Sequence, residues 1–180
     1  MRAEFTRLDL RLRRRMLVGT ALGTAVYLLI IVVVYPAFSH DTAFDAMLAE
    51  NPSVAAAFGI TGSISSPAGW LGANLYANFG PLLALLLTIG YGAAAVAGQD
   101  ADGLLGLLAT LPARRDALLA EKALALAVAA LVVPVAAYAA CLLGPRFDLV
   151  PDWGALAEVT LALAVLAYDL GAVALLVGAI

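Results

Sequence analysis

Apolar residues in this chain fall into four long runs, which are separated by shorter polar intervals. The runs cover residues 17–38, 75–97, 123–143 and 153–180. A membrane-spanning helix needs about 20 consecutive and mostly apolar residues, and each run reaches that length. The pattern therefore predicts an all-α, polytopic membrane helical bundle, a single domain with four transmembrane helices.

Composition supports this class of protein and excludes several kinds of site. Hydrophobic residues make up 64% of the 180 residues and charged residues only 13%, whereas soluble domains carry about 25% charged residues. The chain has a single cysteine, Cys141, and a single histidine, His40, too few for a disulfide or for most metal sites. It also has no glycine-rich loop of the type that binds nucleotide phosphates. We expect no catalytic residue, metal ion or cofactor in the chain itself.

The basic residues predict how the chain is oriented. Nine of the ten lie either before Met16 or between Arg114 and Lys122, whereas residues 39–74 contain none. Basic residues concentrate on the cytoplasmic side of membrane proteins. We therefore expect a cell-membrane protein with the N-terminus and residues 98–122 in the cytoplasm, and with loops 39–74 and 144–152 outside.

The first 16 residues predict an interfacial amphipathic helix. Phe5, Leu8 and Leu12 share one helical face, and most of the arginines lie on the other, as in helices that lie in the lipid headgroup layer. Arginine-rich segments also bind nucleic acid, but one joined directly to a span is more often a topology signal, so no nucleic-acid partner is expected. The apolar run 17–38 is longer than a signal-peptide core, which favours a retained span.

Several polar residues interrupt the apolar runs and are candidates for a translocation pathway. Asn78 and Tyr91 lie in the second run and Asp169 in the fourth. Because an unpaired carboxylate inside a membrane is costly, Asp169 either faces a polar cavity or pairs with another helix. Asn78 is more simply explained by solvation near a membrane surface. Pro81 and the pair Gly90 and Gly92 predict a kink or a close helix approach in the second span.

A polar interval with its own pattern covers residues 98–122, GQDADGLLGLLATLPARRDALLAEK. Asp100 precedes a leucine-rich turn, as suits a helix N-terminus, where a carboxylate can accept backbone N–H groups. Pro112 can occupy the first position of a following helix without losing a hydrogen bond. The interval predicts a short amphipathic helix, a sharp corner and a second helix that enters the membrane.

This stretch resembles the cytoplasmic loop of ABC-2-type transporter permeases, whose pattern is roughly G-E-x-x-x-G-T-L-E-L-L-L-S-L-P-V-S-R followed further on by a lysine. Gln99 and Gly106 stand where the family often has glutamate, and Leu104 where it often has threonine. The matching positions are Gly98, Gly103, Leu105, Leu107, Leu108, Leu111, Pro112, Arg115 and Lys122.

The resemblance implies a permease subunit of an ABC-type exporter. A separate ATP-binding subunit, which holds ATP and magnesium, would dock on residues 98–122, and a second permease copy would complete the pathway for an exported substrate across the lipid bilayer. Such permeases generally have six spans, so the chain is expected to be a fragment or to have its last two spans beyond residue 180. The resemblance assigns coupling to Asp100, Asp102, Gly103, Leu107, Leu108, Leu111, Pro112, Arg114, Arg115 and Lys122.

Two other function classes compete with transport. A polytopic membrane protein that acts as an assembly or signalling subunit would show the same hydropathy, and its 98–122 interval would be an ordinary hairpin. An intramembrane enzyme would need paired carboxylates. Asp169 and Glu158, the acids of the fourth run, are separated by about 16 Å along a helix, too far to share one reaction centre.

Overall fold

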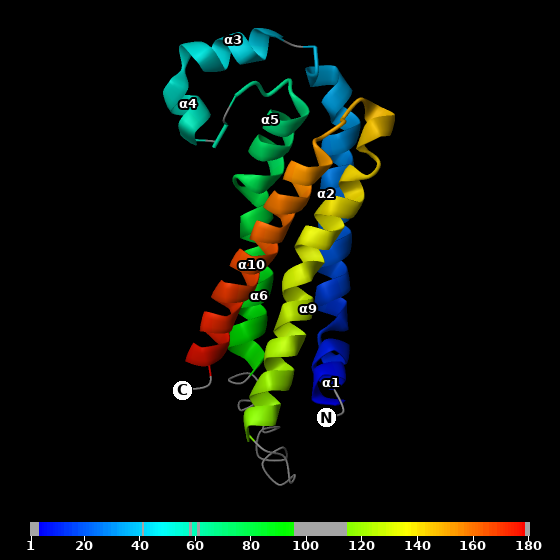
Figure 1. The fold of residues 1–180 in the computed structure, drawn as a ribbon, viewed down its shortest axis with the longest axis vertical. Coiled ribbons are helices and arrows are strands. Elements are labelled where there is room, and N and C mark those ends of the chain that lie inside the picture. Colours follow the sequence, from blue (N-terminus) through cyan, green and yellow to red (C-terminus); the bar gives the residue numbers. More distant parts are fainter. Residues whose placement is uncertain (1–3, 41, 58, 61, 96–114, 179–180) are drawn as a thin grey trace.

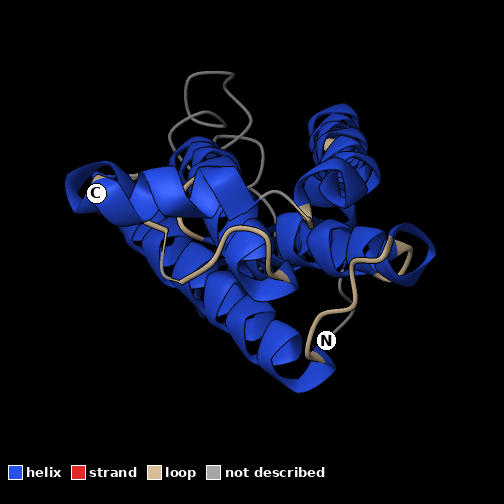
Figure 2. Cartoon of the chain, turned by 90° about the horizontal axis from the view of Figure 1, so that it is seen from above, coloured by secondary structure: helices blue, strands red, loops and turns tan. Residues whose placement is uncertain are grey.

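Four long helices dominate the structure, a computed structural model that describes residues 4–40, 42–57, 59–60, 62–95 and 115–178 (Figure 1). No strand occurs in these ranges (Figure 2). The elements in chain order are α1 (Glu4–Leu12), α2 (Arg14–Phe38), α3 (Thr42–Glu50), α4 (Pro52–Ala57), α5 (Pro67–Leu71), the π-helix η1 (Gly72–Tyr76), α6 (Phe79–Ala93), α9 (Arg115–Cys141), the 3₁₀-helix η3 (Gly144–Phe147) and α10 (Trp153–Val177).

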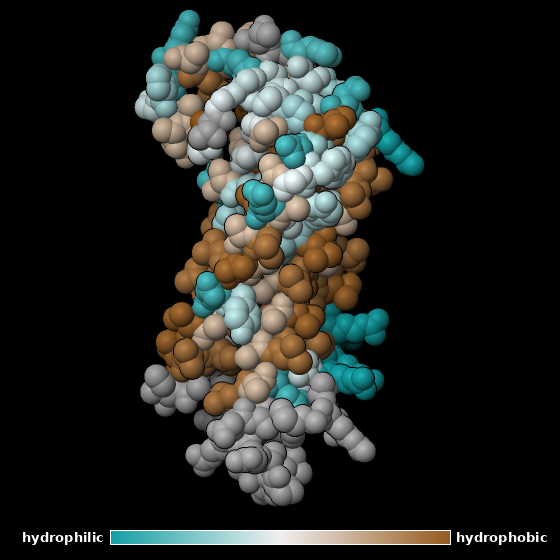
Figure 3. All heavy atoms as spheres, viewed as in Figure 1, coloured by the Kyte–Doolittle hydropathy of each residue, from teal (hydrophilic) through white to brown (hydrophobic). Residues whose placement is uncertain are grey.

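Within the described residues, four helical stretches are long and apolar enough to cross a membrane. They are Arg14–Phe38, Pro67–Ala93, Leu118–Cys141 and Trp153–Val177. On the face that Figure 3 shows, their outward surfaces form an apolar band across the middle of the molecule, as lipid contact requires. The predicted all-α bundle with four spans is confirmed.

The second span begins at Pro67 rather than at Leu75, because Ser66 and Pro67, which were predicted to lie in the loop 39–74, start a helix. The Ser66 hydroxyl accepts a hydrogen bond from the Gly69 backbone N–H at 3.1 Å, and Pro67 occupies the first helical turn. Serine at the N-cap and proline directly after it are the preferred residues there. The loop predicted at 39–74 is therefore shorter, and it contains the helices α3 and α4.

A helix break divides the second span where a kink was predicted. The Ala77 N–H bonds to the carbonyl of Gly72 at 2.8 Å and closes a π-helical turn, and Asn78 then adopts a non-helical conformation before α6. Pro81 explains the break, because a proline ring clashes with the carbonyl four residues earlier. Two neighbouring helices support the broken segment: the Tyr27 hydroxyl of α2 donates to the Asn74 carbonyl, and the hydroxyls of Tyr76 and of Thr160 in α10 lie 2.7 Å apart.

The closest helix pair is α6 with α10, and α9 packs against both α10 and α2. Glycines allow the close contact. A Cβ atom added to Gly92 would lie only 2.3 Å from the carbonyl oxygen of Gly171, and one added to Gly171 would lie 2.9 Å from the Thr88 Cβ. Small residues at membrane helix contacts let the backbones approach in this way. The close approach predicted at Gly90 and Gly92 is found at Gly92, whereas a Cβ atom added to Gly90 would have nothing within 4 Å.

Candidate functional site

The end of α6 and the start of α9 are the two points where the chain enters and leaves residues 96–114. Both lie at one end of the bundle together with α1 and the end of α10, and the opposite end carries α3, α4, α5 and η3 (Figure 1). We call the first of these ends the α1 end. It contains two buried charged residues, Asp9 and Lys122, and charged side chains are rarely buried unless they are paired.

Helix α1 has three distinct faces. Thr6 and Asp9 are buried and face the protein, with Arg13 directly after the helix on the same side. Leu8 and Leu12 are 49% and 61% exposed. Arg7 and Arg11, with Arg14 and Arg15 at the start of α2, form a third, exposed face. The predicted amphipathic helix is present, but it contacts the protein through Thr6, Asp9 and the half-buried Leu10, a face that the sequence pattern did not single out.

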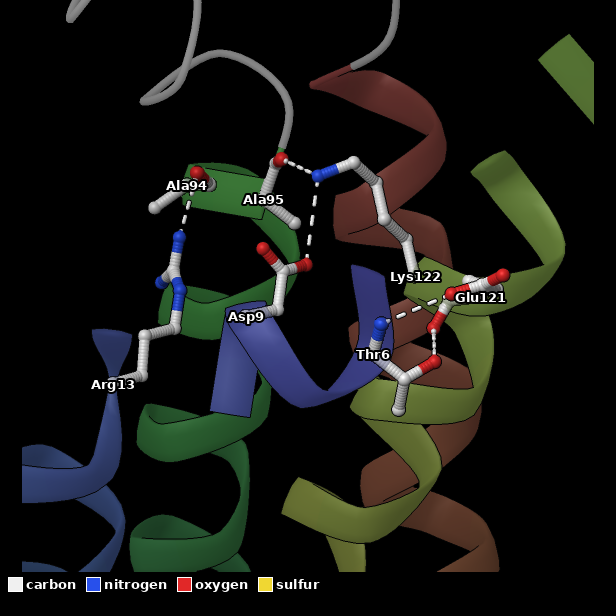
Figure 4. Close-up of polar contacts among 7 residues, drawn as sticks. All are labelled: Thr6, Asp9, Arg13, Ala94, Ala95, Glu121 and Lys122. Carbon is white, nitrogen blue, oxygen red and sulfur yellow. Dashed lines mark hydrogen bonds and ion pairs between the residues drawn. The ribbon is translucent and has the colours of Figure 1, made fainter. Parts of the chain in front are cut away.

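The buried face of α1 binds the first turns of α9 (Figure 4). The Thr6 backbone N–H donates to Glu121 Oε2 at 3.1 Å, and the Thr6 hydroxyl donates to the Glu121 carbonyl at 3.0 Å. Asp9 Oδ2 lies 3.5 Å from the Lys122 Nζ. Both members of this ion pair are buried, with Lys122 6% and Asp9 5% exposed.

Two cations, Arg13 and Lys122, bind the residues that directly follow α6 (Figure 4). The Arg13 guanidinium donates to the Ala94 carbonyl at 2.7 Å, and the Lys122 Nζ donates to the Ala95 carbonyl. Carbonyls at a helix C-terminus lack helical partners and carry partial negative charge. Two cations that are far apart in the sequence therefore supply hydrogen-bond donors to the last carbonyls of this helix.

Tyr91 completes the cluster from inside α6. Its side chain is fully buried, and the Arg13 guanidinium lies 4.7 Å from the ring centroid. A cation in this position is attracted by the electron-rich ring face. We call Thr6, Asp9, Arg13, Tyr91, Glu121, Lys122 and the carbonyls of Ala94 and Ala95 the α1–α9 cluster.

The cluster contains one of the predicted coupling residues, Lys122, and one of the predicted pathway residues, Tyr91. Arg115 begins α9, and its side chain is outside the described residues. The other predicted coupling residues lie in a segment that is also outside them: Asp100, Asp102, Gly103, Leu107, Leu108, Leu111, Pro112 and Arg114.

The three predicted pathway residues are not brought together. Asn78 is half-buried at the helix break, at the opposite end of α6 from buried Tyr91. Asp169 is exposed on α10, where Val165, Leu166 and Leu170 beside it are exposed as well. A carboxylate on the apolar outer surface of a span is costly unless something polar covers it. The pathway role of all three residues stays a prediction.

Sequence reasoning missed Thr6, Asp9, Arg13 and Glu121. Thr6, Asp9 and Arg13 are spaced so that they share one helical face, and Asp9 is an acid among arginines. That spacing was the available signal for a polar protein-facing side. Its hydrogen-bond partners lie between 81 positions (Arg13 to Ala94) and 115 positions (Thr6 to Glu121) away in the chain, so the local pattern could not identify them.

Comparison with known proteins gives one family. Residues 6–180 match the family model described as ABC-2 family transporter protein. No curated protein and no solved structure matches the chain. The match covers nearly the whole sequence and includes the four spans and the α1–α9 cluster. The chain therefore belongs to the ABC-2 family of transporter proteins and is a multi-pass membrane protein with a permease role in ABC-type transport.

Proposed function

We propose that this chain is the permease subunit of an ABC-type exporter in the cell membrane, with its N-terminus in the cytoplasm, and that a separate ATP-hydrolysing subunit docks on residues 98–122. The observation that carries the proposal is the α1–α9 cluster. It binds the chain just before this segment, at Ala94 and Ala95, and at the last two residues of the segment, Glu121 and Lys122. The single side chain of Lys122 contacts both α1, through Asp9, and the end of the second span, through the Ala95 carbonyl.

Such an arrangement suits force transmission. A displacement of residues 98–122 acts directly on the end of α6 and the start of α9. Because Thr6 and Asp9 bind α9 and Arg13 binds the Ala94 carbonyl, the displacement also acts on α1, which leads directly into α2. Helix α10 follows through its close glycine contact with α6. All four spans are thus connected to the docking segment by short contacts.

The pathway is proposed to lie between two permease copies. Asp169 favours this placement, because it faces away from the helices of its own chain and a charge within a span requires a polar environment. In a two-copy assembly, that environment is a polar pathway between the subunits. The substrate class is left open by the residues described.

Co-purification tests the docking step. The full-length protein is expressed with the ATP-binding subunit encoded beside it, as wild type and with Leu108→Asp or Arg115→Glu. The expected result is that wild type retains the ATPase and that both variants lose it while they still insert and fold. Arg146→Glu is the matched control, because Arg146 is an exposed cation in η3, at the opposite end of the bundle. Equal binding by all four proteins would refute docking on this segment.

A further inference from the structure

The arginine face of α1 has no role in the α1–α9 cluster. Arg7, Arg11, Arg14 and Arg15 are all exposed, and none forms an ion pair with the described part of the chain. Asp9 lies on the buried face of α1 and pairs with Lys122 (Figure 4). Four cations are therefore grouped on the surface, and Asp9 does not pair with them; the side chain of Glu4, the other acid of α1, is outside the described residues.

The surroundings of this face favour a lipid partner. Leu8 and Leu12 lie beside the arginines on α1 and are exposed, as is Met16 at the start of α2. Figure 3 shows hydrophilic side chains that project at the edge of the apolar band, beside α1 and the beginning of α2. Helices with leucines next to cations at this level bury the leucines at the acyl boundary and place the cations among the headgroups.

We propose that Arg7, Arg11, Arg14 and Arg15 form a binding site for the phosphate groups of anionic phospholipids, and that lipid binding holds α1 against α9. The opposite face of the same helix carries Thr6 and Asp9, which bind Glu121 and Lys122. Lipid bound to the outer side of α1 makes transient separation of α1 from α9 less frequent. The cluster at the end of the docking segment therefore depends on the composition of the membrane.

The proposal goes further than a topology signal. Basic residues orient spans whatever the lipid, and that role is met by any few cations near the first span. A lipid site instead requires that the stability of α1 changes with the charge of the membrane around the finished protein. Its consequence for transport rests on the proposed function, but the lipid binding itself does not.

Hydrogen exchange of the α1 backbone amides, followed by mass spectrometry without any ATP-binding subunit, tests the proposal. The full-length protein is placed in vesicles of phosphatidylcholine alone or of an equimolar mixture with phosphatidylglycerol. In wild type, the anionic lipid is expected to slow exchange in α1. Each basic residue near an anionic surface is worth about fivefold in binding, so Arg7→Gln/Arg11→Gln should reduce the slowing by up to about 25-fold.

This double variant keeps Arg14 and Arg15, so the orientation of the first span is retained. Arg146→Gln is the control and should respond to the lipid as wild type does. Equal exchange of wild-type α1 in both membranes would overturn the proposal, as would a double variant that retains the full lipid effect. Slowing that appears only when an ATP-binding subunit is added would assign the arginines to a protein interface and would also overturn it. Loss of ATPase docking alone would leave these exchange results unchanged.

Discussion

Removing either member of the Asp9–Lys122 ion pair should destabilise the protein strongly. Lys122 and Asp9 are 6% and 5% exposed, and a buried charge that loses its partner costs about 3–5 kcal/mol. Asp9→Asn leaves Lys122 with the Ala95 carbonyl as a partner, so we expect about 3 kcal/mol. Lys122→Met leaves Asp9 charged and removes the donor to Ala95, and we expect about 4 kcal/mol.

The double variant Asp9→Asn/Lys122→Met measures the interaction energy between the two residues. Because no charge remains unpaired, it should cost less than the two single changes together, with a coupling energy of about 2–3 kcal/mol. The assay is unfolding of the purified protein by titration of dodecyl maltoside micelles with sodium dodecyl sulfate, followed by tryptophan fluorescence. Arg146→Gln, an exposed control, should stay within about 0.5 kcal/mol of wild type. Single variants that each cost under about 1 kcal/mol, or costs that simply add, would refute the reasoning.

Three further predictions concern other parts of the fold. Gly92→Ala should cost about 1–3 kcal/mol in the same titration, because the added Cβ meets the α10 backbone, whereas Gly90→Ala, which has nothing within 4 Å, should be tolerated. The buried Tyr91 hydroxyl has no hydrogen-bond partner among the described residues, so Tyr91→Phe should be neutral or stabilise by up to about 1 kcal/mol. A marked loss of stability would show that the hydroxyl has a partner. Hydrogen bonds from two serine hydroxyls and a backbone N–H lower the pKa of Asp45. The stabilisation of α3 by this carboxylate should therefore be complete above the unfolded pKa of about 3.9 and be lost as pH falls through the lower folded pKa. Hydrogen exchange in α3 measures this loss, and Asp45→Asn should abolish the pH dependence.

The spans and the family could be predicted from the sequence because both depend on local signals. Four apolar runs were enough to predict four spans, and the 98–122 motif was enough to indicate the permease family that the match over residues 6–180 confirms. The start of the second span was misplaced because Ser66 and Pro67 were assigned to the loop 39–74 instead of to a helix start. That signal was also local and could have been used.

The α1–α9 cluster could not be predicted in the same way. Lys122 was assigned to coupling by resemblance, yet its partners are Asp9 and the Ala95 carbonyl, and no periodicity relates these three positions. Buried charges are rare in the described residues, so pairing Asp9 with Lys122 required the arrangement of the helices around them. Three-dimensional packing determined the site, and the hydrophobic pattern determined only the elements that carry it.

The most direct test of coupling through the α1–α9 cluster is ATP hydrolysis by the reconstituted complex of permease and ATP-binding subunit. Wild type is compared with Asp9→Asn/Lys122→Met, which removes the pair without leaving an unpaired charge, and with Arg146→Gln. We predict that the double variant still binds the ATP-binding subunit but no longer changes its hydrolysis rate, whereas wild type and Arg146→Gln do. A double variant that folds, binds and alters hydrolysis as wild type does would contradict the account.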